Sequence, residues 1–272
     1  MVLPSGGRYL EALHAQTPLV HCITNYVAMN TSANILLALG ASPAMLHAVE
    51  EAGDFTALAS ALSVNIGTIS PEFSDGMLAA VRVAHDSATP WVLDPVAVGA
   101  TRYRQRLCAE LLEYAPTLIR GNASEILCLN GIAHQGRGVD STASSTDARD
   151  AAMALAQRQK CLVGVSGEVD LITDGERLAS VAGGHVLMPR ITTLGCGLSA
   201  TAAAFLGVAD NTLESRFDAV TAAFGCFALA GERAAVQAHG PGSFSPAFLD
   251  ALYHLTPDDL DHHFSQEIPH GF

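Results

Sequence analysis

Short runs of apolar residues alternate along the chain with longer segments whose apolar positions recur at helical spacing. Apolar runs of about four to eight residues between turn residues are typical of strands buried on both faces of a sheet. Two further β-like runs, 169–175 and 177–183, predict a hairpin with Asp174 and Gly175 at its turn. The expected parallel strands are 18–23, 43–47, 63–68, 91–95, 117–122 and 161–167.

The helical segments lie between these strands and dominate the last third of the chain. We expect Asn30 or Thr31 to lie near the cap of the first of them and Gly40 to end it, since polar residues and glycine favour these positions. Strands that alternate with helices predict an α/β fold: a mostly parallel central sheet with helices on both faces. The expected helices are 29–40, 50–60, 72–88, 103–114, 124–129, 147–159, 197–208, 213–237 and 245–255.

The 272 residues are expected to form a single domain, because α/β folds of this size commonly have one core. No internal repeat or low-complexity segment divides the chain. Segment 131–146 is polar and rich in glycine, which predicts a loop. Hydrophobic residues make up 49% of the chain, and this content excludes extensive disorder.

Charge and cysteine usage narrow the possible partners. The chain has 27 acidic and 14 basic residues, a net charge of −13 and no Lys/Arg-rich stripe, so nucleic acid and anionic membranes are not expected partners. The most apolar run, 195–209, is too short and too rich in Ala and Gly to span a bilayer. The six cysteines form no Cys-x-x-Cys pair and no signal peptide is evident, which predicts a soluble cytoplasmic protein with reduced thiols.

Asp94 closes an apolar run in "LDPVAVGAT", where an open α/β sheet presents its binding site. A carboxylate there can hold Mg²⁺ directly or through water. The alternative is an Asp that initiates a turn before Pro95. The loop alone leaves both interpretations open.

A second loop, "IRGNASE", also follows an apolar run. Arg120 can pair with phosphate oxygens in a planar fork. Asn122 and Glu125 are three residues apart at a helix start, so they can face one point. Taken alone, this spacing favours a capping box that only stabilises the helix. Beside the Asp94 loop, an acidic site for a nucleotide-bound metal becomes the competing interpretation.

A third stretch, "ITTLGCGLSATAAAFLG", places Cys196 between two glycines at a predicted helix start. Glycine lets a ligand approach the backbone, and the first amides of a helix have no partners within it. Those amides and the helix dipole favour an anion, and they predict a lowered pKa for a thiol placed there. A small hydrophobic Cys in a Gly/Ala helix is the alternative. The two neighbouring loops favour a functional site.

Six segments together resemble the hydroxyethylthiazole kinases, a thiamine-salvage family with the ribokinase-like fold. They are "PLVHCITNYVAMNTSANILLALGASPAMLHAVEE", "LDPVAVGATRYR", "RGNASEI", "GRGVDS", "VSGEVDLITDGERL" and "TTLGCGLSATAAAFLG". The resemblance runs in order from about Pro18 to the predicted helix at 213, and six ordered matches are far more specific than one short motif.

The resemblance implies ATP- and Mg²⁺-dependent phosphorylation of the hydroxyl of 4-methyl-5-(2-hydroxyethyl)thiazole. It also implies a homotrimer with the thiazole bound between subunits. The motifs assign a role to each matching residue: Cys196 is catalytic; Met45, Thr193 and Asn25 bind substrate; Arg120, Ser166 and Gly195 bind ATP; Asp94 and Glu125 handle Mg²⁺ and phosphate.

One departure from the family pattern matters. The family usually reads Thr-Gly-Thr-Gly-Cys where this chain reads Thr192-Thr193-Leu194-Gly195-Cys196, so Thr193 stands at a substrate-contacting glycine position. We therefore expect a slower or weaker-binding enzyme than the family norm. Two alternatives stay open: another ribokinase-like small-alcohol kinase, such as a hydroxymethylpyrimidine kinase, and a catalytically lapsed protein that binds thiazole or nucleotide.

The remaining histidines and Cys22 are expected to be structural. His21 and His47 flank apolar strand ends, where a satisfied structural histidine is the simpler interpretation than a pocket-lining one. The histidines near the C-terminus fit no metal-ligand spacing and predict a solvated tail; they are His254, His262, His263 and His270.

Overall fold

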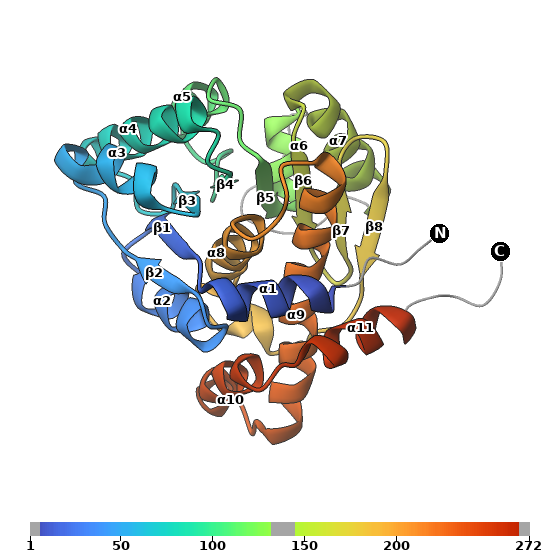
Figure 1. Cartoon of the computed structure of the whole chain (residues 1–272). Helices are drawn as coiled ribbons and strands as arrows, with labels where there is room; N and C mark the ends of the chain where they lie inside the picture. Colours follow the sequence, from blue (N-terminus) through green and yellow to red (C-terminus); the bar gives the residue numbers. More distant parts are fainter. Residues whose placement is uncertain (1–5, 132–144, 267–272) are drawn as a thin grey trace.

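A computed structural model describes residues 6–131 and 145–266. Its centre is a sheet in the order β2-β1-β3-β4-β5-β6-β7-β8 (Figure 1). The first six strands in this order are parallel, and the last two form an antiparallel hairpin. The strands are β1 (Leu19–Ile23), β2 (Ser42–Ala44), β3 (Ala61–Asn65), β4 (Trp91–Asp94), β5 (Leu118–Asn122), β6 (Leu162–Ser166), β7 (Asp170–Thr173) and β8 (Leu178–Val181).

The predicted strands and hairpin are confirmed, although several are shorter than expected. The largest difference is β3, which begins two residues earlier than predicted and ends at Asn65. The predicted strand 43–47 is reduced to the three residues of β2. The hairpin turns at Asp174 and Gly175, where Gly175 has a φ of +94° that favours glycine.

Helices cover both faces of the sheet, as predicted. Neighbouring strand residues alternate between two cores: Val92 packs on one face, while Trp91 and Leu93 pack on the other. The first face is covered by α1 (Gly7–Gln16), α2 (Met29–Ala38), α8 (Leu194–Leu206), α9 (Leu213–Gln237), α10 (Pro241–Tyr253) and α11 (Pro257–Gln266). The second is covered by α3 (Val49–Leu58), α4 (Pro71–Ser87), α5 (Arg102–Leu112), α6 (Ala123–Leu129) and α7 (Ser145–Gln159).

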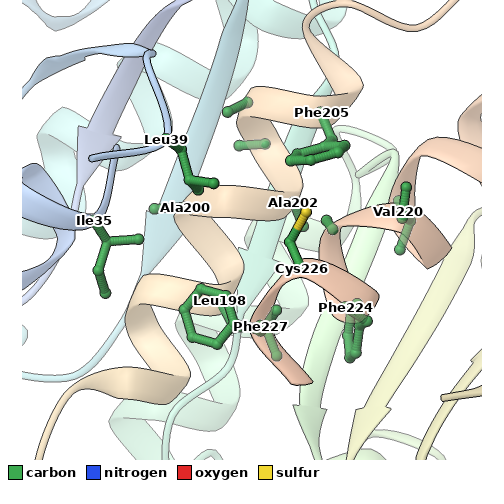
Figure 2. Close-up of a cluster of buried hydrophobic side chains, with 14 of the residues drawn as sticks. Ile35, Leu39, Leu198, Ala200, Ala202, Phe205, Val220, Phe224, Cys226 and Phe227 are labelled. Atoms are coloured by element: carbon green, nitrogen blue, oxygen red, sulfur yellow. The ribbon is translucent and has the colours of Figure 1, made fainter. Parts of the chain in front are cut away.

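The first core is built around α8 and α9, which pack together beside α2 (Figure 2). Small residues on α8 allow this close packing: a Cβ on Gly197 would collide with the Ile35 side chain of α2. Helix α9 is long and apolar enough to cross a membrane by length and composition alone, but 72% of its most apolar stretch is buried inside the protein. It is therefore accounted for as a core helix.

Two terminal helices were not predicted from the sequence. Helix α11 packs against α1 and α9, with Leu260 and Phe264 buried four residues apart on one face. Asp261 accepts a hydrogen bond of 2.8 Å from the backbone N–H of Gly7. The predicted solvated tail is thus wrong for residues 257–266, while His270 lies outside the described residues.

Two other helix boundaries can be compared with expectation. The N-cap of α2 is Ala28, so Asn30 and Thr31 lie in its first turn, near the cap as predicted. Gly40 follows the helix with a φ of +89°, as a stop signal should. Helix α7 begins at Ser145, two residues earlier than predicted, and most of the predicted loop, 132–144, lies outside the described residues.

Candidate active site

Polar side chains end four neighbouring parallel strands at one edge of the sheet. Asn65 ends β3, Asp94 ends β4, Asn122 ends β5 and Ser166 ends β6. The register pairs Asn65 with Asp94 and Asn122 with Ser166. Helix α8 contacts β1, β3 and β4, and the side chains of its first turns reach this row of residues. The arrangement is the one in which open α/β sheets bind ligands.

Asp94 is fully buried at the centre of this row. Its Oδ2 accepts hydrogen bonds from Nδ2 of Asn65 at 2.7 Å and from Oγ of Ser199 at 2.8 Å. Its Oδ1 is buried and has no hydrogen-bond partner. Burial raises the pKa of Asp94 to about 6, and the nearby positive charge of Arg120 opposes this shift.

Arg120 projects from β5 between Asp94 and Ser166. Its Nη1 lies 3.8 Å from Oδ2 of Asp94, and its Nη2 donates a hydrogen bond to Oγ of Ser166. A Cβ on Gly195 would come within 2.9 Å of Nη1, so a side chain at this position would require the guanidinium to shift. The structure therefore brings Arg120, Ser166 and Gly195 together, as the sequence predicts for a phosphate site.

The N-terminus of α8 lies in the same region, near Asp94 and Arg120, and the first amides of a helix have no partners within it. Thr193 is the N-cap residue and makes no side-chain capping bond, and the helix begins at Leu194. Thr193 has a φ of +77°, in the left-handed region that glycine adopts without strain. The departure noted in the sequence thus falls on a position whose backbone favours the glycine that is missing.

Cys196 lies in the first turn of α8, and its Sγ accepts a hydrogen bond from Nδ2 of Asn25 at 3.3 Å. Burial and the negative charge of Asp94 raise the pKa of Cys196 to about 11. The lowered pKa predicted from the helix dipole is therefore wrong, because burial outweighs the dipole. At neutral pH the thiol holds its proton.

Glu125 completes the capping box that its spacing predicted. Its Oε2 accepts the N–H of Asn122 at 2.8 Å, and Oδ1 of Asn122 accepts the N–H of Glu125 at 3.0 Å. Its Oε1 accepts the N–H of Ala97 at 2.9 Å, which ties the loop after β4 to the start of α6. Glu125 thus has a structural role whether or not it also meets a metal.

Met45 and the two strand-end histidines lie away from Asp94. Met45 follows β2 at the edge of the sheet, where β1 and β3 lie between β2 and β4, and it packs against the first core. His21 is fully buried, with Nδ1 bonded to Thr56 and Nε2 to the carbonyl of Leu46, so its structural role is confirmed. Burial lowers the pKa of His21 to about 4. The His47 ring stacks on a phenylalanine of α4, and Cys22 packs in the core.

Three site residues were missed in the sequence. Asn65 fell inside a predicted strand of 63–68, but that strand ends at Asn65. Ser199 lies within the predicted helix 197–208, among small residues that give no sign of a polar role. Arg104 of α5 donates hydrogen bonds to the carbonyls of Ile66, Gly67 and Val96, which joins the loops after β3 and β4. A polar residue at a strand end is the signal that would have found Asn65.

The donor set can be tested for Mg²⁺. Among the described residues, no three His, Cys, Asp or Glu side chains gather closely enough to hold a metal alone. Mg²⁺ commonly binds through one or two carboxylates plus waters and substrate phosphates. The buried, unpartnered Oδ1 of Asp94 fits such a site.

The arrangement of the sheet and its helices is shared with proteins of known structure. A Bacillus subtilis pyridoxal kinase in an ADP complex superposes with a TM-score of 0.59 at 14% identity, covering 79% of this chain and 92% of that one. A ribokinase-like superfamily protein from Enterococcus faecalis superposes with a TM-score of 0.58 at the same identity, covering 86% of each chain. The chain therefore shares the α/β fold of this class of proteins.

Sequence comparison defines the family within this class. The model of the hydroxyethylthiazole kinase family matches residues 10–258. A hydroxyethylthiazole kinase of Rhizobium etli is 55% identical, over 93% of this chain and 96% of the relative. The structure of a hydroxyethylthiazole kinase from Pyrococcus horikoshii OT3 has a TM-score of 0.84 at 37% identity, covering 92% and 93% of the two chains. The chain belongs to the hydroxyethylthiazole kinase family.

Proposed function

We propose that the protein transfers the terminal phosphoryl group of ATP to the hydroxyl of 4-methyl-5-(2-hydroxyethyl)thiazole, with Mg²⁺ as cofactor. The observation that carries the proposal is the convergence of Asp94, Arg120 and the α8 N-terminus at one edge of the sheet. These groups supply what phosphoryl transfer requires: a carboxylate for a metal, a guanidinium and preorganised amides. The names of the close relatives support the choice of acceptor.

The phosphoryl group would be received by the first turn of α8. Its amides have no intrahelical partners, and the helix dipole adds positive potential at this end. Gly195 keeps this turn close to the guanidinium of Arg120. Together they would stabilise charge on the oxygens of the group in transfer.

Asp94 and Glu125 are the residues that would hold Mg²⁺ with the nucleotide. Asp94 offers its free Oδ1, while both oxygens of Glu125 already accept backbone N–H groups. Asp94 is therefore the primary ligand of this proposal, and Glu125 acts directly or through water. When bound, Mg²⁺ supplies positive charge that screens the phosphate oxygens.

Cys196 and Asn25 would meet the acceptor hydroxyl. The thiol is protonated at neutral pH because burial raises its pKa, so it orients the hydroxyl rather than acting as a preformed thiolate base. A weak base or none suffices where positioning and electrostatics dominate the transfer. Asn25 holds the thiol through its side-chain amide.

We further propose a cytoplasmic homotrimer. Exposed apolar side chains in the segment from the end of β1 through α3 support an interface there: Tyr26, Val27, Leu37, Val49 and Leu58. This segment lies on the left of Figure 1, away from α11. Light scattering should give three times the chain mass of 28.3 kDa. A monomeric mass at micromolar concentration with full activity would contradict the trimer.

The acceptor is tested by comparing alcohols. We expect the thiazole alcohol to give a kcat/KM at least about tenfold above that of a hydroxymethylpyrimidine, since a mismatched pocket costs about 1–3 kcal/mol. A preference for the pyrimidine would transfer the assignment to another small-alcohol kinase. Binding of the thiazole alcohol and ADP by calorimetry, with no phosphorylated product, would indicate a lapsed enzyme.

A further inference from the structure

We propose that Asn65 and Ser199 are positioning residues that hold Asp94 in one orientation, and that Asn65 also links Asp94, through Asn25, to Cys196. The inference deepens the proposed function, on which it rests, by adding two residues to the machinery of the same site. Both are buried, and both donate to the same oxygen of Asp94.

The hydrogen bonds around Asp94 are strongly unequal. Oδ2 accepts hydrogen bonds from Asn65 at 2.7 Å and from Ser199 at 2.8 Å, while Oδ1 accepts none. The Ser199 hydroxyl has one proton and a second acceptor, the carbonyl of Gly195, at 3.4 Å, so the shorter bond to Asp94 is preferred. Two donors on one oxygen fix the rotation of the carboxylate and leave Oδ1 for a ligand.

The Asn65 amide has only one orientation that satisfies its neighbours. Its Oδ1 accepts Nδ2 of Asn25 and the N–H of Gly67, each at 2.9 Å. Its Nδ2 must therefore face Asp94, to which it donates. An aspartate could not replace it, because an ionised carboxylate has no proton to donate to Asp94.

Asn25 is oriented in the same way by the backbone. Its Oδ1 accepts the N–H groups of Val27 and Ala28, so its Nδ2 is left to donate to Asn65 and to Sγ of Cys196. The chain Asn25–Asn65–Asp94 thus runs in a single donor direction. Bonds in such a chain polarise one another, so loss of the middle member disturbs both ends.

Replacing Ser199 and replacing Asn65 should therefore have different effects. Ser199 touches only the Asp94 end, so Ser199→Ala should weaken Mg²⁺-dependent ADP binding roughly tenfold, as expected for a lost bond to a charged group. It should leave the KM of the alcohol unchanged. Asn65→Leu, which has a similar volume, should weaken Mg²⁺-dependent ADP binding and also raise the KM of the alcohol.

Calorimetric titration of ADP with saturating Mg²⁺ and with a chelator tests the proposal without turnover. The expected result is weaker ADP binding by Ser199→Ala and Asn65→Leu with Mg²⁺, and binding equal to that of the unmodified protein with the chelator. The matched control is Thr201→Val on the same helix, whose buried hydroxyl has no hydrogen-bond partner; it should change neither titration.

The outcomes separate this proposal from the function on which it rests. Equal ADP binding by Ser199→Ala and the unmodified protein with Mg²⁺, at equal melting temperature, would overturn the positioning role. So would an equal loss with and without Mg²⁺, which would indicate a merely structural effect. If Asn65→Leu does not fold, Ser199→Ala still decides the point. Failure of the unmodified protein to phosphorylate the thiazole alcohol would instead contradict the proposed function.

Discussion

The side-chain amide of Asn25 donates a hydrogen bond to Sγ of Cys196 across 3.3 Å, joining the end of β1 to the first turn of α8. Sγ is thus an acceptor in this bond, and its own proton is not used. The contact fixes the thiol between two segments that lie 171 residues apart. It explains how a cysteine in a glycine-rich turn can have one defined position.

Replacing Cys196 tests whether the thiol orients the hydroxyl or acts as a base. Because its pKa is about 11, we expect Cys196→Ala to lower kcat by less than about 10²-fold, with little change in melting temperature. We also expect kcat of the unmodified protein to be nearly flat from pH 7 to 9. A rise of about tenfold per pH unit, with a loss of 10²–10⁴ in the variant, would assign Cys196 as a thiolate base.

Replacing Glu125 separates its two roles. Glu125→Gln leaves one side-chain acceptor for the N–H groups of Ala97 and Asn122, so it should cost about 1 kcal/mol of stability. It should also raise the Mg²⁺ concentration needed for half-maximal activity. Chemical denaturation and a Mg²⁺ titration measure the two effects. A normal Mg²⁺ titration with reduced stability would leave Glu125 with the capping role alone.

Glycine at position 193 should relieve the strain of the left-handed backbone conformation that Thr193 adopts. We expect Thr193→Gly to raise stability or leave it unchanged, since a non-glycine residue there costs about 1–3 kcal/mol, part of which is offset by the flexibility of glycine in the unfolded chain. It should also lower the KM of the alcohol by removing a side chain from a close-approach position. Steady-state kinetics with the alcohol varied check this, and an unchanged KM would show that the surrounding loop accommodates threonine.

Leu194 is expected to behave differently from Thr193. Its side chain is 6% exposed and belongs to the first core, so we expect it to contribute mainly to packing. Leu194→Thr should therefore cost about 1–3 kcal/mol of stability through lost burial. The double variant Thr193→Gly with Leu194→Thr should improve kcat/KM through position 193 only. A lower KM for ATP in the single variant Leu194→Thr would contradict the assignment of the improvement to position 193.

His21 should make the stability of the fold depend on pH, and its burial determines the direction of the change. Its pKa falls from 6.5 to about 4 on folding, so protonation favours the unfolded chain. The contribution of neutral His21 to the free energy of unfolding is complete above about pH 6.5 and is lost as the pH falls towards 4. From pH 7.5 to 5 the loss should be about 2 kcal/mol, at roughly 1.4 kcal/mol per pH unit.

The His21 effect must be measured against a variant, because other groups titrate in the same range. Burial raises the pKa values of Asp94 and Asp170 to about 6, and their contributions change with pH in the opposite sense. The variant His21→Gln removes the titration of His21 and leaves that of the other groups in place. The difference in unfolding free energy between the two proteins should shrink by about 2 kcal/mol from pH 7.5 to 5. A difference independent of pH would show that His21 does not titrate as described.

The sequence predicted the sheet, its hairpin and the meeting of Asp94, Arg120 and Gly195, because parallel strands place their carboxyl ends at one edge. It did not predict Asn65, since a three-residue error in the end of strand β3 hid it from the site. The raised pKa of Cys196 and the core position of Leu194 depend on burial, which sequence spacing does not show. Helix α11 was missed because its apolar face has only Leu260 and Phe264 buried in a polar segment.

ADP release in the presence and absence of 4-methyl-5-(2-hydroxyethyl)thiazole tests the central claim most directly. With ATP and Mg²⁺, release should depend on the thiazole alcohol, stop when a chelator removes the metal and return when Mg²⁺ is restored. Mass spectrometry should show one phosphate added to the alcohol for each ADP released. Release that is independent of the alcohol, or absent although both ligands bind, would contradict the account.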